Sequence, residues 1–241
     1  MNILVTGGNK GIGLEICRQL ARAGHRVILS ARHTQRGQAA IAQLAGDGLK
    51  AEFLLLDTAD PDNILRAARE LRDRLDALHV LINNAAILDN WEGSILDATA
   101  DDLRATFNTN TVGPVMLTLA LLPLLEAGRP ARVINVSSQL GSISQMTDGW
   151  PGYGISKAAL NAATRKLAQA LQPRGIAVNA ASPGWVKTEM GTDSAPLNVE
   201  QGAQNIIRLV TDFPETFTDH YPRLDRRDHL VRRGLQTELR N

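Results

Sequence analysis

Short apolar runs alternate with helical patterns along most of this 241-residue chain, and this alternation limits the fold more than any other feature. Each run is rich in Val, Ile and Leu, as a strand buried on both faces requires. The expected strands lie at residues 3–5, 27–29, 51–56, 78–82, 131–136 and 176–181, and helical spacing marks 12–20, 35–44, 64–75, 103–125, 153–171 and 206–210. We therefore predict one α/β domain over residues 1–241, a single Rossmann-type doubly wound parallel sheet flanked by helices.

Charge and cysteine content exclude several classes of partner. Lys and Arg number 26 and Asp and Glu 25, so no overall field favours nucleic acid or an anionic membrane. The single Cys17 allows no internal disulfide, and we predict no metal site and a buried structural thiol. No apolar run approaches the roughly 20 residues that span a bilayer. A strand that begins near Asn2 leaves no room for a signal peptide, so we expect a cytoplasmic protein.

A glycine-rich turn joins the first strand to the first helix. Gly7, Gly11 and Gly13 let the backbone turn sharply and approach a ligand, at which the following helix aims its unpaired N–H groups. A diphosphate suits this position, although a plain tight turn would have the same glycines. A nucleotide P-loop would need Gly-Lys-Ser/Thr, whereas the order here is Lys10-Gly11-Ile12.

The second strand indicates which dinucleotide would bind. Enzymes that prefer NAD usually carry an acidic residue about 20 positions beyond the glycines, to bond the ribose hydroxyls. Here that region reads Ser30-Ala31-Arg32, and Arg32 with Lys10 could clamp a ribose 2′-phosphate. The alternative is two ordinary surface bases, but we predict NADP(H) in preference to NAD(H). Asp57, after the third strand, either accepts from the adenine amine or is a turn residue.

Two features lie within the predicted helices, a tyrosine–lysine pair and a proline inside the long helix. Tyr153 and Lys157 are four residues apart, so on a helix they are neighbours on one face. A nearby positive charge lowers the pKa of a phenol from its usual value near 10, which suits general acid–base work; a shared solvated face is the alternative. Pro114 has no N–H for the Asn110 carbonyl four residues earlier, so the helix is distorted there, by design or as an incidental kink that Gly113 eases.

These motifs, in this order, resemble the classical short-chain dehydrogenase/reductase family from Met1 to about Ala203. The resemblance is carried by Thr6-Gly7-Gly8-Asn9-Lys10-Gly11-Ile12-Gly13, Asn83-Asn84-Ala85, Asn110, Ser137-Ser138, Tyr153 with Lys157, and Pro183-Gly184. The first motif and the stretch from Pro183 to Met190 look most like the NADPH-dependent carbonyl reductase branch.

The resemblance implies roles for individual residues. Tyr153 would protonate a carbonyl oxygen while the nicotinamide delivers hydride, and Lys157 would lower the phenol pKa and bond the nicotinamide ribose. Ser138 would polarise the carbonyl, with Ser137 as the alternative, and the Asn110 carbonyl would hold a water that relays protons. The implied cofactor-binding set is Gly7, Asn9, Lys10, Gly11, Ile12, Gly13, Arg32, Asp57, Asn83, Ala85, Tyr153, Lys157, Pro183, Gly184, Val186 and Thr188.

The sequence departs from the family pattern in two places. Ala86 stands where the family usually has glycine after Asn-Asn-Ala, and residues 213–241 form an atypical segment with arginines at 223, 226, 227, 232, 233 and 240. Such a segment is either a solvated tail or a contact with substrate or a partner subunit. Trp150 and Trp185 could line the substrate mouth or simply pack, and a short lid at 190–197 indicates an open pocket.

The leading functional hypothesis is an NADPH-dependent reductase of ketones or aldehydes, whose partner is a small carbonyl or alcohol. The alternatives are an NAD(P)-dependent dehydrogenase of secondary alcohols and a non-catalytic cofactor-binding scaffold. The resemblance also implies a homodimer or homotetramer formed through the long helices beside the active site.

Overall fold

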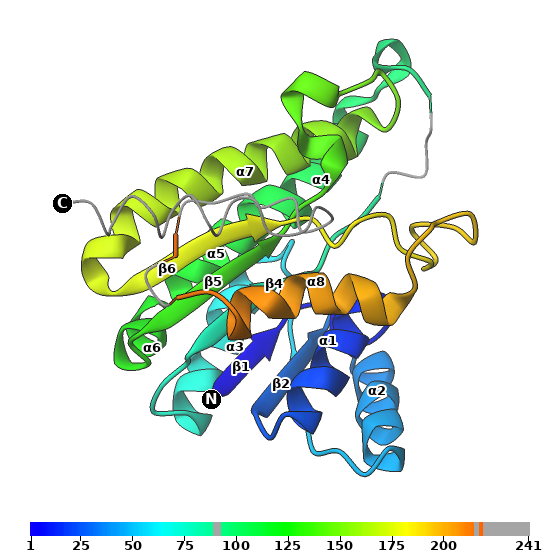
Figure 1. The fold of residues 1–241 in the computed structure, drawn as a ribbon. Helices are drawn as coiled ribbons and strands as arrows, with labels where there is room; N and C mark the ends of the chain where they lie inside the picture. The colour runs from blue at the N-terminus through cyan, green and yellow to red at the C-terminus, as the bar shows by residue number, and fades with distance from the viewer. Residues whose placement is uncertain (89–92, 215–216, 219–241) are drawn as a thin grey trace, which may run out of the picture.

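The computed structural model describes residues 1–88, 93–214 and 217–218, and its core is one six-stranded parallel sheet. The strands are β1 (Asn2–Val5), β2 (Arg26–Ala31), β3 (Glu52–Leu55), β4 (Val80–Asn83), β5 (Ala131–Val136) and β6 (Ile176–Ala181). Their order is β3-β2-β1-β4-β5-β6, so the chain reverses direction across the sheet between β1 and β4 (Figure 1). This arrangement confirms the predicted doubly wound fold, in which ligands bind where the strand order reverses.

Helices cover both faces of the sheet (Figure 1). They are α1 (Gly11–Arg22), α2 (Thr34–Gly46), α3 (Pro61–Arg74), α4 (Ala100–Phe107), α5 (Gly113–Ala120), α6 (Leu122–Ala127), α7 (Pro151–Leu171) and α8 (Val199–Thr211). One apolar core joins the sheet to α3, α5, α6 and α7, and a second joins it to α1, α2 and α8. Among these helices none is both long and apolar enough to cross a membrane.

The two largest differences from the predicted helices lie beyond β4 in the chain. The stretch expected to be one helix over 103–125 is divided into α4, a π-helical segment (Asn108–Val112), α5 and α6. The last helix, expected at 206–210, begins at Val199, because Asn198 and Gln201 form a reciprocal capping box. The arginines predicted to form a charged C-terminal segment lie outside the described residues.

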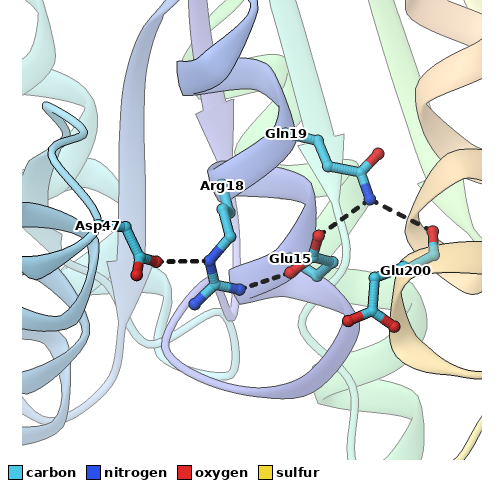
Figure 2. A network of polar contacts seen from close by, with 5 residues as sticks. All are labelled: Glu15, Arg18, Gln19, Asp47 and Glu200. Carbon is cyan, nitrogen blue, oxygen red and sulfur yellow. Dashed lines mark hydrogen bonds and ion pairs between the residues drawn. The ribbon is translucent and has the colours of Figure 1, made fainter.

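A polar network fixes α1 against its neighbours (Figure 2). The buried Glu15 carboxylate accepts from Arg18 and from Gln19, one turn further along the same helix. Arg18 also donates to Asp47, which follows α2, at 2.8 Å, and Gln19 donates to the Glu200 carbonyl in α8 at 3.3 Å (Figure 2). These bonds hold the helix whose first turn faces the predicted cofactor crevice.

Arg132, in β5, is a buried arginine that anchors the chain after α8. Its guanidinium donates to the carbonyls of Leu209 at 3.1 Å, Phe213 at 2.9 Å and Pro214 at 3.3 Å. Charge-assisted bonds to three carbonyls offset the cost of burying this cation. The end of α8 is thereby fixed to the sheet.

Candidate active site

The glycine-rich turn between β1 and α1 has the backbone geometry that the sequence predicts. Gly7 and Gly11 have φ of +63° and +53°, which side chains rarely adopt. A Cβ at Gly13 would lie 2.4 Å from the Gly7 carbonyl oxygen and 2.5 Å from Asn84 Nδ2, so only glycine fits this position. The first turn of α1 can therefore approach a ligand closely.

Two polar residues that sequence reasoning did not single out join this turn to the segment after β4. The buried Thr6 hydroxyl accepts from the backbone N–H groups of Asn84 at 3.0 Å and Ala85 at 2.9 Å. The Asn84 side chain donates in return to the Thr6 carbonyl at 2.9 Å and the Gly7 carbonyl at 3.3 Å. Both residues lay inside quoted motifs, but their pairing depends on the adjacency of β1 and β4.

Asn83, predicted to contact the cofactor, has its side chain in the core. Its Nδ2 donates to Asn135 Oδ1 at 2.8 Å and approaches Thr118 Oγ1 at 3.5 Å. Asn135 in turn donates to Thr164 in α7 at 2.8 Å. The Asn83 amide thus ties β4 to β5 and the helices behind them, and a cofactor contact would fall to its backbone.

Of the two bases predicted to bind the 2′-phosphate, Arg32 follows β2 and Lys10 directly precedes α1. Arg32 is exposed directly after β2, and Ala31 is buried where an NAD-preferring site would place its acid. Lys10 is also exposed, but it forms an ion pair with Glu189 in the segment that follows β6. Asp57 forms a local turn, since its carboxylate accepts from the Ala59 N–H at 2.9 Å.

Tyr153 and Lys157 lie one above the other near the start of α7. Lys157 Nζ is 5.5 Å from the centroid of the Tyr153 ring and donates to the Val136 carbonyl, at the end of β5, at 2.8 Å. The side chains of both residues are buried, with Tyr153 keeping 9% of its surface exposed. Burial lowers the pKa of Lys157 from 10.5 to about 7, because the charged ammonium is desolvated.

The two candidate serines after β5 differ in accessibility. Ser138 is partly exposed, and its hydroxyl accepts from the Leu140 N–H at 3.2 Å. Ser137 is buried, and in the described part of the chain its hydroxyl has no hydrogen-bond partner. Of the two hydroxyl-bearing residues, Ser138 is the more accessible.

Asn110 is fully buried in the π-helical segment between α4 and α5. Its side-chain amide accepts from the Ile87 N–H and donates to the Ile87 carbonyl, both at 2.9 Å. The same amide donates to Ser156 Oγ at 3.1 Å, and Ser156 donates to the Tyr153 carbonyl at 2.8 Å. Asn110 therefore joins the loop after β4 to the helix that carries Tyr153, and Ser156 is a link that sequence reasoning missed.

The segment after β6 bonds to α8 and approaches the glycine-rich turn. Gly184 has φ of +87°, and the preceding Pro183 carbonyl accepts from Asn205 in α8 at 3.0 Å. Val186 is buried, and the Thr188 methyl lies 3.5 Å from a Cβ built on Gly11. Of the predicted residues of this segment, Thr188 therefore lies beside the glycine-rich turn.

The two tryptophans that the sequence offers for a substrate mouth differ in exposure. Trp185 and Met190 are exposed, and Trp185 Nε1 donates to the Gly191 carbonyl at 2.6 Å. Trp150, half-buried, adopts a left-handed backbone with φ of +53° directly before α7. Within the described ranges no group of three or more His, Cys, Asp and Glu side chains could hold a metal ion.

The chain was compared with known protein families and structures. Residues 1–197 match the model of the short chain dehydrogenase family. The NADPH carbonyl reductase 3 of Mus musculus is 34% identical, over 90% of this chain and 93% of its own. The structure resembles that of the carbonyl reductase Sniffer of D. melanogaster, with a TM-score of 0.84 and 33% identity over 93% of this chain and 96% of that one.

A further likeness is to the NADPH-bound carbonyl reductase from chicken fatty liver, with a TM-score of 0.82 and 30% identity over 91% of this chain and 94% of that chain. The family match covers β1 to β6 and every residue of the candidate site. This protein belongs to the short-chain dehydrogenase/reductase family.

Proposed function

We propose that this protein is an NADPH-dependent oxidoreductase that reduces a ketone or aldehyde to an alcohol. The observation that carries the proposal is the placement of Tyr153 over buried Lys157, with the accessible Ser138 hydroxyl at the end of β5. The similarity to NADPH carbonyl reductases supports the same reaction class.

The residues of the crevice fit a dinucleotide phosphorylated on its ribose. Gly7, Gly11 and Gly13 leave room for a diphosphate at the first turn of α1, since a side chain at any of them would be strained or would clash. Exposed Arg32 and Lys10 supply positive charge for a 2′-phosphate, and the buried Ala31 offers no carboxylate for a ribose hydroxyl pair. Bound NADPH would supply the hydride for the carbonyl carbon.

Tyr153 is the proton donor in this proposal. Its phenol would protonate the carbonyl oxygen as charge develops there, and the Ser138 hydroxyl would donate a second hydrogen bond to the same oxygen. Lys157 lies close enough for its ammonium to stabilise the resulting phenolate. A low protein dielectric strengthens this interaction, because both groups are buried.

Asn110 would help to return a proton to the active site after each turnover. Its side-chain amide is engaged with Ile87 and Ser156, so the side chain positions Tyr153 and is not itself the relay. Its backbone carbonyl lies in the π-helical segment, where Pro114 offers no N–H four residues on. That carbonyl is the group we assign to hold a water that returns a proton toward Lys157.

The test is a titration with NADPH and NADH, followed by turnover with quinones, aromatic aldehydes and diketones. We expect tight NADPH binding and cofactor consumption. Tyr153→Phe should still bind NADPH but lose turnover by at least about a hundredfold, because the proton donor is removed. A fully active Tyr153→Phe would refute the assignment. The ratio of reduced to oxidised cofactor at which turnover occurs decides whether carbonyl reduction or alcohol oxidation is the preferred direction.

We also propose a homodimer or homotetramer. Val112, Met116 and Leu119 are exposed at helical spacing along the π-helical segment and α5, and such an apolar stripe suits helix–helix packing between subunits. Light scattering should give at least twice the 26.1 kDa chain mass, and a single mass near that of the chain would refute the assembly.

A cytoplasmic location and a single domain remain our proposals. The lone buried Cys17 supports the first, and the sheet shared by all six strands supports the second.

A further inference from the structure

The segment after β6 contacts the glycine-rich turn through a charged pair as well as through Thr188. Lys10 Nζ forms an ion pair with Glu189 Oε2, although the two residues are 179 positions apart in the chain. Lys10 directly precedes α1, and Glu189 directly follows the Thr188 whose methyl lies against Gly11. The Glu189 carboxylate is therefore bound to Lys10, one of the two basic residues that the proposed function assigns to the 2′-phosphate.

The charges around this pair favour an anion. The hydrogen bond from Lys10 holds the pKa of the Glu189 carboxyl below its usual range, and Arg36 in α2 lowers it further. The side chains of Lys10 and Glu189 are 58% and 79% exposed. A pair so open to water is weak and exchanges readily, so a stronger anion can replace the carboxylate.

We propose that Glu189 is a specificity-determining residue, which competes with the 2′-phosphate of NADP(H) for Lys10. The inference rests on the proposed function. Lys10 carries a single point charge, so a dianionic phosphate brought to it must displace Glu189 or be repelled by it. NADH has no 2′-phosphate and can bind with the ion pair intact. Glu189 therefore weakens the binding of NADPH but not that of NADH, and so lowers the ratio of NADPH affinity to NADH affinity.

The decisive substitution is Glu189→Gln, which keeps the size of the side chain and removes its charge. We expect the dissociation constant for NADPH to fall about two- to fivefold, as for a released exposed ion pair, while that for NADH stays unchanged. The measurement is nicotinamide fluorescence in equilibrium titrations, with no substrate and no turnover. Raising the salt concentration from 0.05 to about 0.5 M should remove most of the difference, because exposed charges are screened.

Two controls separate this mechanism from a general change of charge. Asp193→Asn removes another exposed carboxylate four residues further along the same segment, and it should leave the NADPH to NADH affinity ratio unchanged. In a Lys10→Met background, Glu189→Gln should no longer alter NADPH affinity, since the contested base is absent.

Other outcomes would overturn the inference. Equal tightening of both cofactors in Glu189→Gln would mean that charge acts on the whole dinucleotide and not on the 2′-phosphate. Weaker binding of both would mean that the ion pair closes the segment over the bound cofactor. If Glu189→Gln binds NADPH as the wild type does, and the wild type binds it normally, the role of Glu189 is refuted and the proposed function stands. Wild-type protein that binds no NADPH would instead refute the proposed function, and this inference with it.

Discussion

Replacing Lys157 by Met should make the protein more stable while it abolishes turnover. The Lys157 side chain, on α7, is buried with its ammonium at the end of β5, and its pKa is lowered from 10.5 to about 7 by desolvation. In the unfolded chain the side chain regains its ordinary pKa, so between about pH 7 and 10.5 the unfolded state holds one more proton than the folded state. The free energy of unfolding therefore rises with pH through this window. Below about pH 7 the folded protein carries the full free-energy cost of the buried ammonium.

The magnitude follows from the pKa difference. A difference of 3.5 between 10.5 and about 7 corresponds to about 5 kcal/mol of cost at pH 6, at about 1.4 kcal/mol for each pKa unit. Methionine keeps an apolar stem of similar length but leaves the Val136 carbonyl without its donor, which costs about 1–3 kcal/mol. We expect Lys157→Met to unfold with a free energy about 2–4 kcal/mol higher at pH 6.

The assay is urea unfolding, followed by tryptophan fluorescence, of wild-type and variant protein at pH 6, 7, 8 and 9 without cofactor. The stability gap should shrink by about 2–3 kcal/mol from pH 6 to pH 9, as the wild-type lysine loses its proton. Lys166→Met, an exposed lysine on the same helix, is the control and should show a constant small difference. Parallel pH profiles for wild type and Lys157→Met, or a less stable variant at pH 6, would refute the reasoning.

Two further substitutions test the backbone of the site and the anchor of α8. Gly13→Ala places a methyl 2.4 Å from the Gly7 carbonyl, so NADPH affinity should fall at least about tenfold in fluorescence titrations; Gly46→Ala, with open space around it, should bind normally. Arg132→Met removes a donor from three carbonyls and should lower the unfolding free energy by about 2–4 kcal/mol in urea, whereas exposed Arg174→Met should change it by less than about 1 kcal/mol. Wild-type affinity in Gly13→Ala, or equal effects of the two arginine substitutions, would contradict these expectations.

Most of the sheet was predictable because most of its strands are buried on both faces, whereas the edge strand β3 leaves Leu55 exposed. Strands buried on both faces read as short continuous apolar runs, and for β5 and β6 the predicted bounds equal those of the structure. The start of α8 was also visible in the sequence, since Asn198 and Gln201 have capping-box spacing, but apolar periodicity alone placed it later. Helix interiors were therefore easier to predict than helix ends.

The distortion at Asn110 was predictable in kind and not in extent. Local chemistry alone, the missing N–H of Pro114, indicates a gap in the helix. The π-helical segment and the bonds from the Asn110 amide to Ile87 and Ser156 involve residues 23 and 46 positions away. Those partners are set by how α4, α7 and the loop after β4 pack, which no local pattern specifies. The same holds for Lys10. Its charge predicted a phosphate contact, but no local pattern predicted its ion pair with Glu189.

The polar groups buried around the site differ in how far hydrogen bonds offset the cost of their burial. Both the amide oxygen and the amide nitrogen of Asn135 are bonded, to Asn83 and to Thr164, and Thr164 donates to a helix carbonyl, so the burial of these two residues costs little. Lys157 differs, because within the described residues its ammonium bonds one backbone carbonyl, and desolvation lowers its pKa. A cation next to Tyr153 is what acid–base chemistry requires, and a neutral side chain there is what stability favours. Selection for a more stable variant should therefore replace Lys157 before it replaces Asn135, and each variant that lacks Lys157 should be inactive.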